Sequence, residues 1–197
     1  EDDDQQVNIT RYSLFYPEKR VFFQERSDMF DFTFGYNGAN GNVFYSRRIG
    51  LYDGHPVRIL GGARLTGKIG KTDIGLINMQ TAKYTDELPS ENFNILRLKR
   101  SIINPYSYAG GIFTSRAGMN GSLNLTYGFD SFISTSEHNY IEIKASQTYD
   151  SGGDYKNIMD NTFLRFNSEN RNIKGLSYRA AFDWMGKDFD PAIGFVQ

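Results

Sequence analysis

The segment ILGGARLTGKIGKTDIGLINMQT, residues 59–81, holds two apolar runs on either side of Gly70-Lys71. In its first half, apolar and polar residues alternate with a period of two, so that Leu65 falls on one face and Arg64 and Lys68 fall on the other. A period of two is the pattern of a β-strand with two different faces. The segment therefore predicts a β-hairpin that turns at Gly70-Lys71.

The same segment contains the frame of a phosphate-binding P-loop over residues 62–68, but it breaks the motif. The motif needs Ser or Thr after the lysine because that hydroxyl binds Mg²⁺, and Ile69 stands there instead. A second frame that ends at Thr72 has Leu65 where its first glycine belongs. We therefore expect no nucleotide as a ligand, and we expect residues 62–68 to be extended.

Composition narrows the class of protein. The chain has 197 residues, a net charge of −1 and no cysteine, so we expect no disulfide framework, no thiolate metal site and no nucleic acid partner. Its two histidines, His55 and His138, are far apart in sequence, and we expect no histidine-based metal site. Aromatic residues make up 15% of the chain and glycine occurs 20 times, which favours an all-β fold. We expect no cofactor.

The rest of the chain predicts long strands joined by turns. A membrane-spanning β-strand needs roughly 9–11 residues, and several of the expected strands reach that length. The fold prediction is a single all-β segment over residues 1–197, an antiparallel meander, with an acidic linker end at residues 1–6. The expected strands cover residues 7–15, 21–25, 43–51, 57–69, 72–83, 94–103, 106–116, 122–134, 140–149, 161–167 and 173–185.

Alternation separates an apolar face from a polar face in the clearest strands. We expect one face of residues 122–134 to carry Leu123, Leu125, Tyr127 and Phe129. In residues 173–185 we expect the face with Leu176, Tyr178, Phe182 and Trp184 to lie opposite Arg179 and Asp183. This pattern fits a soluble β-sandwich or barrel. It fits an outer-membrane β-barrel equally well, where the apolar face meets lipid and the polar face lines the lumen.

Six short motifs in a fixed order give a resemblance to a known family: FYPEKRVFFQE, FYSRRIGL, ILGGARLTGK, IGLINMQT, NFNILRLKR and GGIFTSR. They resemble the C-terminal barrel-like domain, of unknown function, in Gram-negative surface proteins that begin with a family-9-type carbohydrate-binding module. The resemblance is clearest over residues 7–116. It implies a β-barrel in the bacterial outer membrane, with membrane lipid as a partner.

This chain differs from the family proteins in two respects. The carbohydrate-binding module is absent from this chain, so no sugar-binding residue is carried over. The family domain is longer, and the final GFVQ is unlike the end of a closed barrel. We therefore expect this chain to be an incomplete part of a larger β-barrel.

The first functional hypothesis is a non-catalytic barrel segment that serves transport, or is a platform for other outer-membrane proteins in glycan handling. Cations that line a pore favour anions or acidic sugars. The favoured interpretation is simpler: these charges are only solvated, or pair with Asp130, Glu142 and Asp183, inside a plugged barrel. The candidate lumen-facing cations are Arg58, Arg64, Lys68, Arg97, Lys99 and Arg179.

Two further hypotheses stay open. A soluble glycan-binding module would use aromatic side chains on an open sheet face, and the available ones are Tyr12, Tyr16, Tyr36, Tyr45 and Tyr52. Part of a carbohydrate-active hydrolase would need two facing carboxylates. Nothing in the sequence pairs two acidic residues, so we predict no catalytic, cofactor-binding or metal-binding residue and no enzymatic activity in this segment.

Overall fold

The structure is a computed structural model, and it describes most of the chain. The backbone is described for residues 18–33, 43–52, 55–135, 139–151, 159–170, 176–185, 188–190 and 193–196. Side chains are described for residues 18–33, 43–52, 55–135, 140–149 and 151. The expected strand at residues 7–15 and the acidic linker end at residues 1–6 lie outside the described residues.

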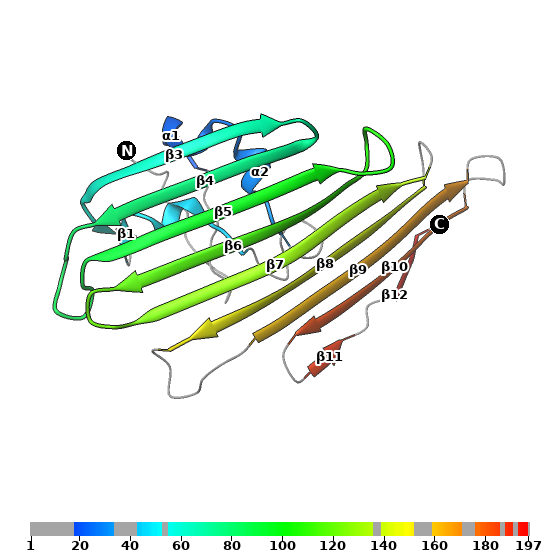
Figure 1. The fold of residues 1–197 in the computed structure, drawn as a ribbon. Coiled ribbons are helices and arrows are strands. Elements are labelled where there is room, and N and C mark those ends of the chain that lie inside the picture. Colours follow the sequence, from blue (N-terminus) through cyan, green and yellow to red (C-terminus); the bar gives the residue numbers. More distant parts are fainter. Residues whose placement is uncertain are drawn as a thin grey trace.

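One antiparallel sheet dominates the fold, and it confirms the predicted meander of long strands (Figure 1). Its ten strands follow the order β11-β10-β9-β8-β7-β6-β5-β4-β3, with β12 also paired to β10. Within the described residues β3 has a neighbour on one side only, so the sheet is open. The strands are β3 Ile59–Ile69, β4 Thr72–Thr81, β5 Glu91–Ser101, β6 Tyr108–Gly118, β7 Leu123–Ser134, β8 Asn139–Asp150, β9 Met159–Asn170, β10 Leu176–Met185, β11 Asp188–Asp190 and β12 Ile193–Val196.

The predicted hairpin at residues 59–81 is confirmed. Strands β3 and β4 pair antiparallel, with Ile69 opposite Thr72, so that Gly70 and Lys71 form the turn. Gly70 has φ +59°, a left-handed conformation that glycine adopts without a steric penalty. Residues 62–68 are extended within β3, as predicted.

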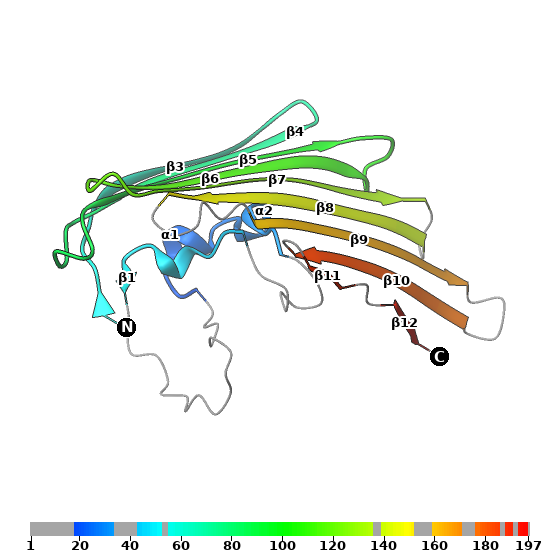
Figure 2. The same ribbon diagram turned by 90° about the horizontal axis from the view of Figure 1, so that it is seen from below.

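The expected strands at residues 21–25 and 43–51 are wrong, because residues 21–24 form a one-turn helix and residues 46–48 form a 3-10 helix. Helix α1 covers Val21–Gln24 and α2 covers Ser27–Phe30, and neither has a side-chain cap. Helices this short are not stable alone, so packing against the sheet must hold them. They lie under the concave face of the curved sheet, together with the 3-10 helix η2, Ser46–Arg48 (Figure 2). We call residues 18–33 and 43–50 the cover. A short two-stranded piece, β1 Leu51–Tyr52 and β2 His55–Pro56, follows it.

The hydrophobic core lies between the cover and the concave face. On the cover side it contains Phe23, Met29 and Phe30, and on the sheet side it contains Ile77 and Ile95. Each such side chain contributes roughly 1.5–3 kcal/mol when it is removed from water. A second, smaller cluster joins Phe32 of the cover to Ile112 of β6.

The two faces of the sheet differ in the way the alternation predicts. In β7, Tyr127 and Phe129 are 52% and 50% exposed on the convex face, whereas Thr126 and Asp130 are buried on the concave face. The shared face of Leu123, Leu125, Tyr127 and Phe129 is therefore confirmed, and it is the solvent-exposed face. The side chains of residues 173–185 lie outside the described ones.

Glycines on the concave face let the cover approach the sheet. A Cβ atom at Gly75 of β4 would lie 2.6 Å from Phe30 Cζ and 3.1 Å from Met29 Cε. Gly128 of β7 has the same relation to Phe32, at 2.8 Å. Any larger residue at these positions would push α2 and the residues after it away from the sheet.

Gly75→Val is expected to lower the free energy of unfolding by about 1–3 kcal/mol, because the new side chain overlaps Phe30. The matched control is Gly67→Val in β3, where a Cβ atom would meet nothing within 4 Å. We expect the control to change the free energy by no more than about 0.5 kcal/mol. Denaturant titration of the two variants measures both values, and equal effects would contradict the close approach of α2 to β4.

Candidate functional site

A buried ion pair joins β5 to β7 on the concave face. Arg97 donates from Nη1 and Nη2 to the two carboxylate oxygens of Asp130, at 2.7 and 2.6 Å. Its Nε donates to the carbonyl oxygen of Met29 at 3.1 Å, and its guanidinium lies 5.4 Å from the centre of the Phe32 ring. The side chains of the pair are 0% and 2% exposed. A predicted lumen-facing cation therefore pairs with Asp130, as the plugged-barrel interpretation expects.

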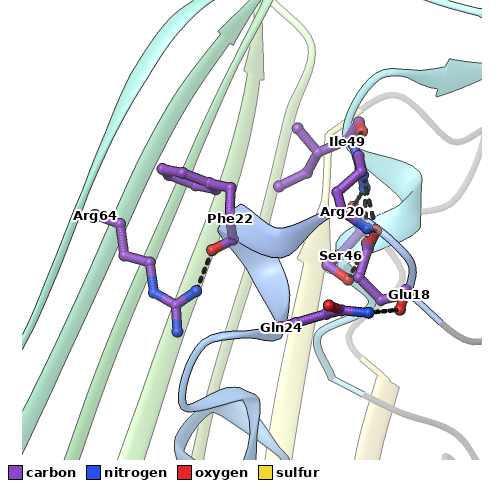
Figure 3. Close-up of polar contacts among 7 residues, drawn as sticks. All are labelled: Glu18, Arg20, Phe22, Gln24, Ser46, Ile49 and Arg64. Carbon is purple, nitrogen blue, oxygen red and sulfur yellow. Dashed lines mark hydrogen bonds and ion pairs between the residues drawn. The ribbon is translucent and has the colours of Figure 1, made fainter.

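The other predicted cations have different surroundings. Arg64 donates to the carbonyl oxygen of Phe22 in α1 (Figure 3). Lys99 lies 4.2 Å above the Tyr108 ring, and Lys68 is 56% exposed and 3.7 Å from Asp73.

Arg64, Lys68 and Lys99 lie on the same face of the sheet as Arg97, which is the concave face. Arg58 precedes β3 and is exposed. The side chains of Arg179 and Asp183 lie outside the described residues. Glu142, the third predicted acidic partner, forms an ion pair with Lys144 at 2.7 Å. Whether this face lines a lumen stays a prediction.

A polar network closes the cover on itself and ties together its two parts (Figure 3). Arg20 binds Glu18 through Nε and Nη2, at 2.9 and 2.8 Å. It also donates to the carbonyl oxygens of Ile49 and Ser46, at 2.6 and 2.9 Å. The Ser46 hydroxyl donates to Glu18 Oε2 at 2.6 Å. Glu18 therefore accepts hydrogen bonds from both parts of the cover at once.

The network controls the charge of Glu18. Burial alone would raise the pKa of this carboxyl group, but hydrogen bonds from Arg20 and Ser46 outweigh burial and lower the pKa from 4.5 to about 2. The carboxylate form therefore favours the closed cover.

The cover also reaches the far strands of the sheet. Lys144 of β8 donates to the carbonyl oxygen of Thr33 at 2.9 Å. Together with the contacts of Arg97 to Met29 and of Arg64 to Phe22, this makes three sheet cations that bind backbone carbonyl groups of the cover. Their main structural task is to hold the cover in place.

A cavity of about 520 Å³ lies between residues 43–52 with Val57 and strands β4 to β7. Tyr45 and Tyr52 line it, whereas the other tyrosines proposed for glycan contact, Tyr12, Tyr16 and Tyr36, lie outside the described residues. An ion pair between Glu91 and Arg116 also lines the cavity, with Nη2 2.7 Å from Oε1.

Sequence reasoning missed the residues that the sheet contributes to this cavity. Alternation along ENFNILRLKR already places Glu91 and Phe93 on the same face as Arg97. Strand pairing sets Phe93 opposite Arg116, and only the register between β5 and β6 reveals that neighbour.

In the described part of the chain, no group of three or more His, Cys, Asp or Glu residues could hold a metal ion. No helix there is long and apolar enough to cross a membrane.

The model of one protein family matches part of the chain. It is a domain of unknown function (DUF5916), and it matches residues 1–65, which include the cover and the start of β3. No curated protein and no solved structure matches the chain. The similarity to a domain of unknown function agrees with the sequence-based resemblance, while its carbohydrate-binding-module context stays a prediction.

Asp130→Ala is expected to lower the free energy of unfolding by about 3–5 kcal/mol, because it leaves the buried Arg97 charge unpaired. Adding Arg97→Met to Asp130→Ala removes that charge and should recover part of the loss. Asp86→Ala is the control, since Asp86 pairs with Lys83 at 2.6 Å but is 98% exposed, and no measurable change is expected. Denaturant unfolding tests the series, and a small effect of Asp130→Ala would contradict a tightly buried pair.

The cover should loosen at low pH. Because the pKa of Glu18 is lowered to about 2 in the folded state, its stabilising effect is complete above about pH 4.5 and is lost as the pH falls toward 2. Glu18→Gln should loosen the cover at neutral pH already. The exchange rates of the α1 amides, corrected for intrinsic rates, should differ between the parent protein and Glu18→Gln at about pH 6. The two sets of rates should converge at about pH 2. Equal exchange at both pH values would refute this role of Glu18.

Proposed function

We propose that this chain forms part of a β-barrel in the bacterial outer membrane, with its convex face against lipid and the cover inside as a plug. The observation that carries the proposal is the apolar belt on the convex face. It is defined by side chains that are 36–62% exposed: Leu65, Leu76, Leu96, Leu98, Phe113, Tyr127, Phe129 and Ile143.

The belt is continuous across neighbouring strands. The register places Leu65 opposite Leu76, Leu76 opposite Leu96, Leu96 opposite Phe113, and Phe113 opposite Tyr127. Soluble monomers rarely expose contiguous apolar patches larger than a few hundred Å². An outer-membrane barrel exposes such a band to the hydrocarbon core of the bilayer.

The belt also runs obliquely to the strands. From β3 to β7 it contains the row of Leu65, Leu76, Leu96, Phe113 and Tyr127. In β5 and β7 it also contains Leu98 and Phe129 of the next row, and in β8 it reaches Ile143, one row further along the sheet. Strands of membrane barrels are tilted by roughly 35–45°, so a belt that is level in the membrane crosses successive strands at shifting positions.

Polar side chains end the belt on one side. We call Asn78, Gln80, Asn92 and Asn94 the amide row; they share the convex face and bond to one another, for example Asn78 to Asn94 at 2.6 Å. Such groups fit the zone where the membrane meets water.

The arrangement of the concave face favours a platform over an open pore. The cover occupies this face, and the carboxylates of Asp130 and Glu91 are engaged in ion pairs. A plugged barrel can hold partner proteins at the cell surface without conducting solutes through this part. We propose a non-catalytic role on the same grounds.

Phe113→Arg tests the lipid contact. Phe113 is 40% exposed, so a soluble protein would tolerate arginine there, whereas a charge at mid-depth in a bilayer costs about 2–4 kcal/mol. Ala117→Arg is the matched control on the same strand and face. It lies about 13 Å along β6 toward the end with the amide row, where the cost falls to about 0–1 kcal/mol.

The measurement is assembly in the outer membrane of a Gram-negative host. We expect the unmodified chain, expressed with the whole protein to which it belongs, to stay in the membrane fraction after a carbonate wash. Phe113→Arg should reduce the assembled fraction strongly, and Ala117→Arg should reduce it little. A soluble, monodisperse protein that both variants leave unchanged would refute the proposal.

A further inference from the structure

The cavity between residues 43–52 and the sheet has the size and position of a ligand site. Its volume of about 520 Å³ is within the usual range for small-molecule pockets, roughly 300–1,000 Å³. It lies where β5 and β7 begin and β4 and β6 end, which is the end of the sheet that carries the amide row. A ligand could therefore enter it from the aqueous side if the barrel proposal holds.

The ion pair in the cavity presents a donor and an acceptor side by side. Nε and Nη2 of Arg116 both contact the same carboxylate oxygen, Oε1 of Glu91, at 2.8 and 2.7 Å. Glu91 is 7% exposed, whereas Arg116 remains 43% exposed, and its guanidinium lies 6.0 Å from the centre of the Phe93 ring. The guanidinium is thus held by one edge, and its other edge stays accessible for a ligand.

Such a pair matches two neighbouring hydroxyl groups. Each hydroxyl group is both a donor and an acceptor, so one can accept from Arg116 while the next donates to the carboxylate of Glu91. Because the carboxylate stands beside the guanidinium, a phosphate or another multiply charged anion would be repelled as well as attracted. The side chains of Asn124 and Thr114, on the same face, add neutral hydrogen-bonding groups.

Aromatic side chains complete the lining. Tyr45 and Tyr52 come from the segment over the sheet, and Phe93 comes from β5. Tyr52 is 40% exposed and lies next to Tyr84, with 6.5 Å between ring centres. Aromatic rings offer flat apolar surfaces with polar groups at the edge, which suits a ligand that has C–H groups on its faces and hydroxyl groups at its rim.

We propose that this cavity binds a sugar ring, with the vicinal hydroxyl groups on the Glu91–Arg116 pair and a ring face against Tyr45 or Tyr52. The inference does not rest on the barrel proposal, because residues 43–52, Val57 and the sheet would form the same cavity in a soluble protein. Membrane extraction tests one proposal and sugar binding tests the other, so either can fail alone.

The test is titration of the full chain with glucose, galactose and mannose, followed by calorimetry and ligand-observed NMR. If detergent is needed, it must lack a sugar headgroup. We expect saturable binding of at least one of these sugars at millimolar concentration. Arg116→Lys keeps the charge beside Glu91 but removes the planar fork, and Tyr52→Ala removes an exposed ring; each should weaken binding about tenfold.

Tyr106→Ala is the matched control, since Tyr106 is 79% exposed in the loop at the opposite end of β5 and β6, and it should bind as the parent does. Unchanged far-ultraviolet circular dichroism shows that each variant is folded. Absence of saturable binding for all three sugars would overturn the proposal, as would equal affinity in parent and cavity variants. Binding of inorganic phosphate without binding of any sugar would overturn it in favour of an anion site.

Discussion

The buried pair of Arg97 and Asp130 is the interaction on which the rest of the structure depends. Removing two charges from water is costly, and only near-ideal geometry and additional hydrogen bonds offset that cost. Here the carboxylate receives two short bonds, and Nε of Arg97 donates to the backbone carbonyl of Met29. The pair also requires Gly110, where a Cβ atom would lie 2.8 Å from Asp130 Oδ1. A slip of one residue in β5 would turn Arg97 to the convex face, so the pair specifies the strand register as well as the position of the cover.

The concave face of the sheet carries buried cations among its apolar side chains, whereas the apolar belt lies on the convex face, and this arrangement explains the cover. A concave face with Arg64, Arg97 and Lys144 cannot be packed with apolar side chains alone. The cover supplies backbone carbonyl groups to these three cations and apolar side chains to the spaces between them. The convex face, by contrast, receives nothing from the described part of the chain, and its exposed belt is the basis of the proposed contact with lipid.

Much of the sheet could be predicted from the sequence, because a period of two is a local signal. The hairpin at Gly70-Lys71 and the faces of β7 follow from that period alone. The cover could not be predicted, since VFFQ is rich in β-forming residues and becomes helical only when Phe23 docks on the sheet. The pairing of Arg97 with Asp130 was one of several possibilities in the sequence, and the pairing of Glu91 with Arg116 was missed. Both depend on register, which the turns between strands determine and alternation does not.

The contacts of the cover span long distances along the chain, and this has a kinetic consequence. Met29 meets Arg97 across 68 residues, and Thr33 meets Lys144 across 111. Since the cover precedes every strand of the sheet, it leaves the ribosome before them and finds its last anchor only after β8 has been synthesised. Contacts of such high sequence separation form slowly, because the entropy cost of closing a long loop must be met before the contact stabilises the chain. The cover is therefore made before the sheet but is among the last parts of this segment to reach its final place.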